Sequence, residues 1–472
     1  MMLTYNFQNV TGPLYEYIYL RLKEDILSGK LAPHEKLPSK RSFANNNGIS
    51  TITIQNAYDQ LISEGYVYTR PKKGYYVANI NQTKIIPTQA KIDLGIQTPP
   101  QPLKFDCDLS SNQLAPKSFP FSVWTKLLRQ TIAQRKDALM EVSPTGGQTE
   151  LRQAIAEHLK SFRGMLVDPN QIIVGAGTEY LYSLLIQLLG QDKKYCTENP
   201  GYKRLAQIYQ QAGVDCTYID IDDYGVTADD LRNSQADIAH LSPNHHFPTG
   251  ISMPANRRYE VLAWANEMDG RYIIEDDYDS EFRLQGRPIP TLFSSDACEK
   301  VIYLNTFSKS LTPTIRISYM VLPAHLANRF YQQLSFYACT VSNFEQYTLA
   351  AFIGQGYFEK HINRMRLYYR RQRSRVIKII TTSSLAPYCE ILENDAGLHF
   401  VLKLKTKLSD QEITQRMAQA GIHLTSMAAY YLTPEHVSQH LFIINYSNIN
   451  TDKLHDACQK LTEIIKKGAI RK

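Results

Sequence analysis

Lys309 lies in a setting that favours chemistry over simple solvation. It belongs to the stretch NTFSKSLTPTIRISY, residues 305–319, where hydroxyl side chains flank it and Arg316 follows in the same stretch. A lysine reacts with aldehydes when it is held away from water among groups that also hold the aldehyde. An isolated lysine is more often a surface residue, so this interpretation depends on what the rest of the chain supplies.

Pyridoxal 5′-phosphate (PLP) is the aldehyde cofactor that such a lysine holds, and it needs further groups. Its phosphate binds backbone N–H groups, hydroxyls and an arginine, its pyridine nitrogen binds a carboxylate, and its ring stacks on an aromatic side chain. The stretch VGAGTEYLYSLL is a glycine-containing turn that leads into a helix. The amides of Gly177, Thr178 and Glu179 can therefore cradle a phosphate.

Three more motifs follow in order along the chain. ENPGYKRL contains Tyr202, which can stack on a ring, and LSPNHHFPTG contains polar groups that can reach the ring hydroxyl. IIEDDYDSEF ends a predicted strand with Asp276 and Tyr278. The adjacent Asp277 is an alternative to Asp276, and Tyr278 could instead be a core residue.

His245 and His246 raise the alternative of a metal site. The sequence has no third ligand at metal spacing beside them, so we expect His246 on the cofactor side and predict no metal. The seven cysteines are scattered and contain no CxxC pair. This pattern favours reduced thiols in a cytoplasmic protein over a disulfide framework or a structural zinc site.

The elements that must position these residues indicate an α/β fold over residues 103–472. Helical stretches alternate with short apolar runs such as QIIVGAG, DIAHLSP, YIIEDDYD and KVIYLNTF. Apolar strands that open into loops with Gly or Ser indicate a mostly parallel sheet with ligands at the strand ends. The segment from CEILENDAGLHFVLKLK to QHLFIINYSN predicts a smaller C-terminal α+β subdomain.

Residues 1–78 predict a separate winged helix-turn-helix. Apolar residues at helical spacing, with capping serines and closing glycines, predict helices within 13–29, 39–48 and 50–65. Two aromatic and β-branched runs around residues 71–74 predict a hairpin with a basic tip.

Residues 79–102 lose this periodicity and end in prolines, which predicts a linker. Hydrophobic content of 43% and charged content of 21% are typical of globular chains. The net charge of +7 permits a nucleic-acid partner without demanding one. The sequence has neither an apolar run long enough for a transmembrane helix nor a secretory signal pattern.

The N-terminal unit resembles the GntR-type winged helix in LPSKRSFANNNGIS, in AYDQLISEGYVYTRPKKGYYV and in their spacing. It departs from that pattern at Thr51, where such domains usually carry an arginine. The resemblance implies double-stranded promoter DNA as the partner, and a protein-docking winged helix is the alternative. The candidate DNA contacts are Ser39, Lys40, Arg41, Thr51, Thr53, Gln55, Lys72 and Lys73.

Residues 105–465 resemble fold-type I aminotransferases in the order and spacing of five motifs, and the whole chain resembles the MocR-type regulators. The resemblance implies that Lys309 forms the Schiff base with PLP, that Asp276 pairs with the pyridine nitrogen and that Tyr278 bonds the ring oxygen. The other implied contacts are Tyr202 for stacking, Thr178, Thr306, Ser308 and Arg316 for the phosphate, and Arg204 beside the pocket for an anionic effector.

An arginine clamp for the substrate α-carboxylate distinguishes an enzyme from a sensor. In aminotransferases and in GABA-responsive MocR members, that arginine follows a strand of the C-terminal subdomain. The matching stretch is LFIINYSNINTDKL, where we align Asn448 with the clamp. We therefore expect a PLP sensor with at most residual transaminase activity, similar to the PdxR-like regulators of vitamin B6 biosynthesis.

Two alternatives stay open. One is an amino-acid-responsive regulator, and the other is a PLP-dependent aminotransferase that carries a DNA-binding head. In each case we expect a homodimer through residues 103–472, because fold-type I sites are usually built at a dimer interface. A dimer would present two winged helices to two half-sites on the promoter.

Overall fold

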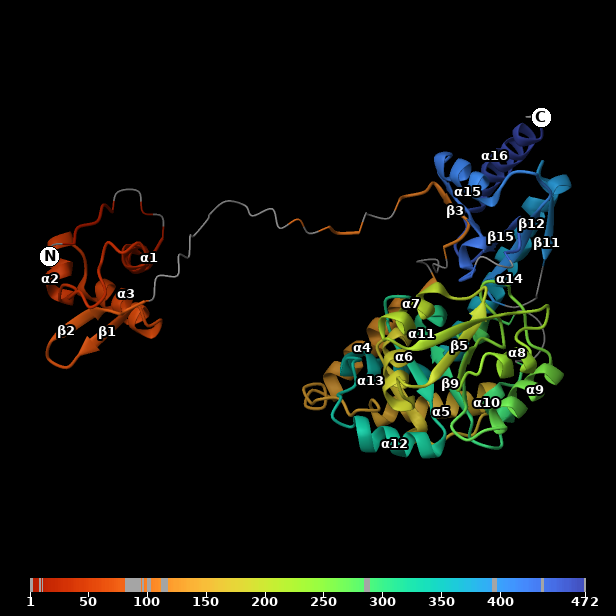
Figure 1. Ribbon diagram of the computed structural model, residues 1–472, viewed down its shortest axis with the longest axis horizontal. Coiled ribbons are helices and arrows are strands. Elements are labelled where there is room, and N and C mark those ends of the chain that lie inside the picture. Colours follow the sequence, from red (N-terminus) through yellow and green to blue (C-terminus); the bar gives the residue numbers. More distant parts are fainter. Residues whose placement is uncertain are drawn as a thin grey trace. The chain divides into compact units, whose positions relative to one another are not determined.

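The computed structural model contains two compact units, Met1–Gln101 and Pro102–Lys472 (Figure 1). The predicted linker, 79–102, lies largely outside the residues that the structure describes. Those residues are 3–7, 10, 12–80, 95, 97–99, 103–111, 118–283, 289–392, 397–433 and 437–470.

The first unit consists of three helices and a hairpin, as the sequence predicts. Helix α2 begins after Ser39, whose hydroxyl accepts a hydrogen bond from the Ser42 amide at 3.2 Å. Ser50 caps α3 in the same way, through the Ile52 amide at 3.3 Å. Gly48 ends α2 in the left-handed region. The elements are α1 (Leu14–Leu27), α2 (Lys40–Asn47), α3 (Thr51–Ser63), β1 (Val67–Arg70) and β2 (Gly74–Val77).

The second unit is built on a seven-stranded sheet in the order β4-β10-β9-β8-β7-β5-β6. The prediction of a mostly parallel sheet is confirmed, since only β10 is antiparallel to its neighbours. The strands are β4 (Ile172–Gly175), β5 (Lys194–Asn199), β6 (Asp215–Asp220), β7 (Ile238–Leu241), β8 (Tyr272–Asp276), β9 (Val301–Thr306) and β10 (Ser318–Val321).

Helices cover both faces of this sheet, because successive strand residues point to opposite sides. Ile172 and Val174 pack into one core with α5 (Thr149–Arg163) and α13 (Asn343–Gly354). Ile173, between them, packs into another core. The helices on that side are α6 (Thr178–Leu189), α7 (Lys203–Gln211) and α12 (Ala324–Leu334), while α8 (Ala228–Asn233) and α9 (Ala255–Asn266) pack together beside β7 and β8.

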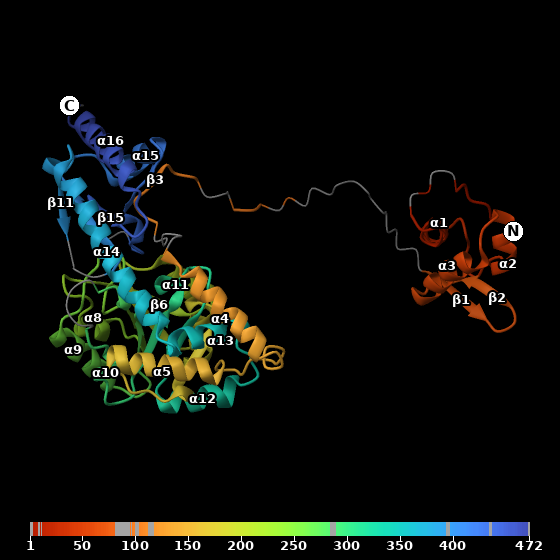
Figure 2. The same ribbon diagram turned by 180° about the vertical axis from the view of Figure 1, so that it is seen from behind.

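A four-stranded antiparallel sheet forms the C-terminal subdomain, in the order β11-β12-β15-β14. Its strands are β11 (Cys389–Leu392), β12 (His399–Leu404), β14 (Thr425–Ser426) and β15 (Leu441–Asn445). The long helix α14 (Tyr357–Thr382) runs from the large sheet to this subdomain (Figure 2). The helices α15 (Asp410–Gln419) and α16 (Thr451–Ile470) pack on each other, and α16 packs on α14.

Strand β3 (Cys107–Asp108) pairs in parallel with β13 (Ile422–His423), so the start of the second unit joins the C-terminal subdomain. Helix α4 (Phe121–Gln134) packs on α13, and the short α10 (Leu292–Ser295) and α11 (Phe307–Ser310) flank β9 in the sequence. No helix in the described ranges is long and apolar enough to span a bilayer.

Candidate cofactor-binding site

A pocket of about 480 Å³ opens where the strands β5, β7, β8 and β9 end. The carboxyl ends of parallel strands are where α/β sheets bind their ligands. The structure brings all but one of the predicted cofactor and effector residues to its lining, namely Thr178, Glu179, Tyr202, Arg204, His246, Asp276, Tyr278, Thr306, Ser308, Lys309 and Arg316.

Lys309 lies on the single-turn helix α11, directly after β9. Thr306 caps this helix, because its hydroxyl accepts a hydrogen bond from the Ser308 amide at 3.1 Å. Burial lowers the pKa of Lys309 to about 8, and the charge of Asp279 opposes this effect only in part. A larger share of the amine is therefore neutral near pH 7 than in an exposed lysine, as a nucleophile requires.

Asp276 ends β8 and presents a carboxylate to the pocket. Its Oδ2 accepts a hydrogen bond from the Tyr182 hydroxyl at 2.6 Å, and the Nε2 of His240 lies 3.6 Å away. Its Oδ1 is buried and has no hydrogen-bond partner among the described residues. Buried carboxylate oxygens need donors, so this atom fits the protonated ring nitrogen of a pyridine.

Tyr182 and His240 are pocket residues that the motifs do not single out. His240 in turn lies 2.7 Å from the Tyr209 hydroxyl, through its Nδ1. The sequence does place Tyr182 near the predicted phosphate-binding turn, because it follows Thr178 by one helical turn and so shares its face of α6. The partner of Tyr182, however, lies 94 residues further along the chain.

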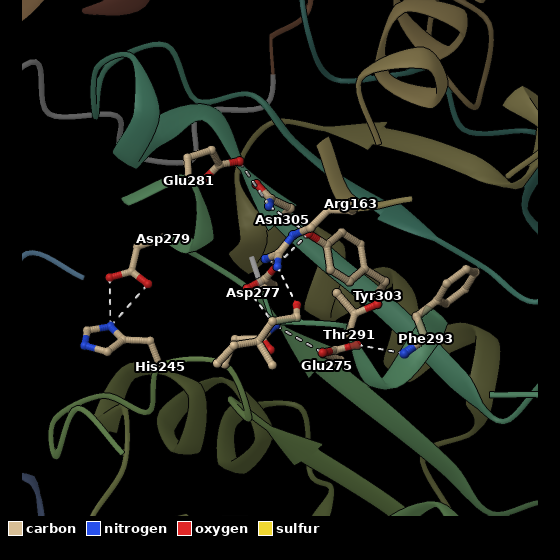
Figure 3. A network of polar contacts seen from close by, with 12 residues as sticks. Arg163, His245, Glu275, Asp277, Asp279, Glu281, Thr291, Phe293, Tyr303 and Asn305 are labelled. Carbon is tan, nitrogen blue, oxygen red and sulfur yellow. Dashed lines mark hydrogen bonds and ion pairs between the residues drawn. The ribbon is translucent and has the colours of Figure 1, made fainter. Parts of the chain in front are cut away.

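Asp277 lies outside the pocket, in the buried polar network of Figure 3. It forms an ion pair with Arg163 and accepts a hydrogen bond from the Tyr303 hydroxyl at 2.7 Å. Glu275 accepts hydrogen bonds from the amides of Leu292 and Phe293, each at 3.0 Å. Alternation along β8 thus directs Asp276 away from both of its acidic neighbours.

Tyr278 and His246 line the pocket together with Asp276, and His245 lies behind them outside the described lining. The Tyr278 hydroxyl lies 3.1 Å from Nδ1 of His245, which also pairs with Asp279 at 2.9 Å. Burial lowers the pKa of His246 to about 3, so this pocket residue is neutral at pH 7. A Cβ on Gly397 would lie 1.9 Å from the His245 ring, so only glycine fits there.

The N-terminus of α6 lies at the pocket, and its predicted role is to bind a phosphate. Gly177, the predicted residue absent from the lining, is the N-cap of α6, with φ of +94°. A Cβ there would lie 2.2 Å from Nη2 of Arg316, so the guanidinium approaches as closely as only glycine allows. Arg316 and Arg204 both form ion pairs with Glu179, the latter at 3.0 Å.

Glu179 is held as a charged carboxylate by these two arginines. Burial raises its pKa, but the hydrogen bonds from Arg316 and Arg204 outweigh burial and the pKa lies below its ordinary value. The side chain of Glu179 is 27% exposed, against 49% for Arg316 and 62% for Arg204. Both arginines are therefore more exposed than the one carboxylate that they share.

Asn448 is exposed beyond the end of β15 and does not line the pocket. The alignment of Asn448 with the clamp therefore stays a prediction, and this residue contributes nothing to the described lining. Among the described lining residues, the arginines are Arg204 and Arg316 alone. The inference that the pocket lacks a clamp arginine therefore rests on its described lining residues and not on Asn448.

Among the further lining residues, five that were not predicted as contacts are Ser110, Glu198, Ser242, Phe247 and Tyr430. Burial raises the pKa of Glu198 to about 8, although the Ser242 amide donates to its carboxylate at 2.8 Å. Tyr430 comes from the C-terminal subdomain, and its carbonyl accepts a hydrogen bond from the Gly201 amide at 3.1 Å. Only the tertiary fold brings Ser110 and Tyr430 to this pocket.

The first unit leaves most of its candidate DNA contacts accessible. Arg41, Thr51 and Gln55 are exposed on α2 and α3, and Lys40 and Thr53 are half-buried. Lys72 and Lys73 are exposed in the turn between β1 and β2. Ser39 is exposed but also caps α2. Ile52, beside Thr51, is 70% exposed. It is a further, apolar candidate for a DNA contact, which a search for polar residues does not find.

A winged helix-turn-helix together with an aminotransferase-type lysine pocket defines a transcriptional regulator built on an enzyme fold. Two family models match the chain, "Bacterial regulatory proteins, gntR family" over residues 14–77 and "Aminotransferase class I and II" over residues 106–461. The chain belongs to the aminotransferase class I and II family and, with its gntR-family head, to the MocR-type transcriptional regulators.

Several relatives match this chain almost from end to end. It is 35% identical to the HTH-type transcriptional regulator YhdI of Bacillus subtilis, over 95% of each chain. It is 29% identical to the probable rhizopine catabolism regulatory protein MocR of Rhizobium meliloti, over 95% of this chain and 93% of the relative. It is 31% identical to the HTH-type pyridoxine biosynthesis transcriptional regulator PdxR of Corynebacterium glutamicum, over 87% of each.

Solved aminotransferases share the fold of the second unit. The multiple substrate aminotransferase of Thermococcus profundus superposes with a TM-score of 0.68 at 23% identity, over 77% of this chain and 92% of that one. The kynurenine aminotransferase of Pyrococcus horikoshii gives a TM-score of 0.67 at 23% identity, over 77% and 91%.

The cofactor of the second unit is PLP, and the residues of the pocket fit it. The buried amine of Lys309 with its lowered pKa, the unpaired buried oxygen of Asp276 and the amides at the start of α6 match its aldehyde, ring nitrogen and phosphate. When bound, PLP supplies an aldehyde for an amine and a ring that withdraws electrons.

Proposed function

We propose that this protein is a PLP-responsive transcriptional regulator of PLP (vitamin B6) synthesis genes, with PLP at Lys309 as its effector. The observation that carries this proposal is which arginines line the pocket and what they pair with. Within the described lining, both arginines pair with Glu179 on the phosphate side, and none is left to hold a substrate α-carboxylate. The similarity to a pyridoxine biosynthesis regulator supports the same effector.

The proposal gives each pocket residue a role toward PLP. Lys309 binds the aldehyde carbon, Asp276 accepts the proton of the ring nitrogen, and Tyr278 donates to the ring oxygen, with His246 on the same side. The ring stacks on Tyr202. The phosphate is held by the amides of Gly177, Thr178 and Glu179, the hydroxyls of Thr178, Thr306 and Ser308, and Arg316.

Regulation requires that PLP and DNA influence each other through the protein. PLP must bind more tightly to one conformation, and that conformation must differ in affinity for the promoter. We propose a homodimer through residues 103–472 as the unit that responds. Exposed apolar side chains on and after α4 support this assembly: Phe121 at 66%, Ile132 at 42%, Met140 at 75% and Val142 at 81% exposure.

An aminotransferase that carries a DNA-binding head is the second candidate. The observation that favours it is the presence of Asp276 and of a lysine with a lowered pKa, Lys309, in the lining of one pocket. Such a pair would support proton transfer as well as sensing. An amino-acid-responsive regulator would use the same pocket but would need a partner for the effector carboxylate, and Arg204 would have to leave Glu179 to serve as that partner.

The test is a DNA-binding titration with a fragment of the promoter beside this gene or beside the PLP synthase genes. We expect PLP alone to change the affinity or the footprint of the full-length protein. Fast conversion of PLP to its amine form with an amino acid, together with no DNA binding at moderate salt, would favour the enzyme instead.

A further inference from the structure

The three side chains Glu179, Arg204 and Arg316 form a charged triad at the mouth of the pocket. One carboxylate oxygen of Glu179 contacts Nη2 of Arg316, and the other lies 3.0 Å from Nη1 of Arg204. The backbone of Glu179 also belongs to the first turn of α6. A carboxylate therefore contacts Nη2 of the arginine that the phosphate of PLP needs.

An acidic side chain is unexpected beside a phosphate. A phosphate monoester carries nearly two negative charges at pH 7, so a charged carboxylate within contact distance of the same arginine disfavours it. A neutral side chain of the same length would leave Arg316 available. The low pKa of Glu179 means that protonation does not remove the conflict at pH 7.

We infer that Glu179 is a specificity and affinity determinant that competes with the PLP phosphate for Arg316 and so weakens cofactor binding. Arg204 makes the competition reversible, because it gives the carboxylate a second cationic partner when the phosphate takes Arg316. A sensor needs such a device, since a site that is always saturated cannot report a change in concentration. This inference rests on PLP as the ligand of the proposed regulator.

The geometry of Gly177 supports direct competition. Arg316 has a left-handed backbone, with φ of +51°, and its guanidinium lies against Gly177 at the start of α6. The guanidinium thus lies beside the amides that we propose bind the phosphate. Glu179 reaches it from the first turn of α6. Phosphate and carboxylate would therefore both draw on the guanidinium of Arg316.

The experiment is equilibrium binding of PLP to full-length wild-type and Glu179→Gln protein, followed by cofactor absorbance. We expect Glu179→Gln to bind PLP at least about threefold tighter, a modest factor because solvent partly screens this group. Pyridoxal, which lacks the phosphate, should bind both proteins alike. The gain for PLP should shrink as salt is raised.

Glu150→Gln is the matched control, because Glu150 pairs with Arg135 at 2.6 Å outside this pocket. It should bind PLP as the wild type does. Unchanged or weaker PLP binding in Glu179→Gln would overturn the inference, as would equal tightening for PLP and pyridoxal. The proposed function is judged separately: it fails if PLP leaves the promoter complex unchanged, whatever Glu179→Gln does.

Discussion

The hydroxyl of Tyr182 donates a 2.6 Å hydrogen bond to the carboxylate of Asp276. Tyr182 lies on α6, the helix whose first turn we propose as the phosphate cradle, and Asp276 ends β8. This bond therefore fixes the spacing between the phosphate side and the ring side of the cofactor pocket. It also leaves the second carboxylate oxygen of Asp276 for the cofactor.

Tyr182→Phe should weaken PLP binding about three- to tenfold, because a hydrogen bond to a charged group contributes roughly 1.5–3 kcal/mol and water replaces part of it. PLP affinity can be measured by absorbance titration. Tyr180→Phe is the control. It removes a tyrosine hydroxyl two residues earlier, outside the described pocket lining, and should leave the PLP affinity unchanged. Equal affinities for all three proteins would contradict the role of this bond.

Lys309→Ala should remove covalent attachment of PLP without unfolding the protein. Reduction with borohydride followed by intact mass measurement should show added cofactor mass on the wild type and none on the variant. Cofactor mass retained by Lys309→Ala on a different lysine would mean that the attachment site is assigned wrongly.

The rate of PLP capture should depend on pH through Lys309. Burial lowers its pKa to about 8, and only the neutral amine attacks an aldehyde. The capture rate should therefore rise as the pH increases toward about 8 and level off above it. Stopped-flow absorbance gives this profile. A rate that still climbs steeply up to the ordinary lysine pKa of 10.5 would exclude the lowered value.

Mutations of Asp276 and Asp277 should affect different properties, although the two residues are adjacent. Asp277→Asn leaves the buried guanidinium of Arg163 without its ion-pair partner and should cost about 3–5 kcal/mol of unfolding free energy. Asp276→Asn should change stability little and weaken PLP binding. Denaturant unfolding and PLP titration of both variants separate the two effects, and the reverse pattern would contradict the geometry.

The sequence was sufficient for the two units and for the motifs around Lys309, because order and spacing along the chain carry that information. The choice between Asp276 and Asp277 follows from strand alternation, once β8 ends at residue 276. The alignment of Asn448 with a clamp position stays a prediction, because that residue lies outside the described pocket lining. Tyr182, His240 and Tyr430 depend on contacts between distant segments, which periodicity does not encode.

The wing lysines should contribute to DNA binding through charge alone. Replacing Lys72 and Lys73 together by alanine should lower affinity for all DNA sequences and reduce the slope of log affinity against log salt by about 1–2. Ile52→Ser should act differently, because we expect this exposed apolar side chain to contact thymine methyl groups and not phosphates. Its loss should change sequence preference and leave the salt slope intact. Fluorescence anisotropy over a salt series measures both quantities.

The effector role of PLP is tested most directly by promoter affinity measured with and without PLP, for the wild type and for Lys309→Ala. The account predicts that PLP alone changes the affinity or footprint of the wild type, and that Lys309→Ala stays in one state at either PLP concentration. A promoter complex that ignores PLP but responds strongly to an added amino acid would contradict it.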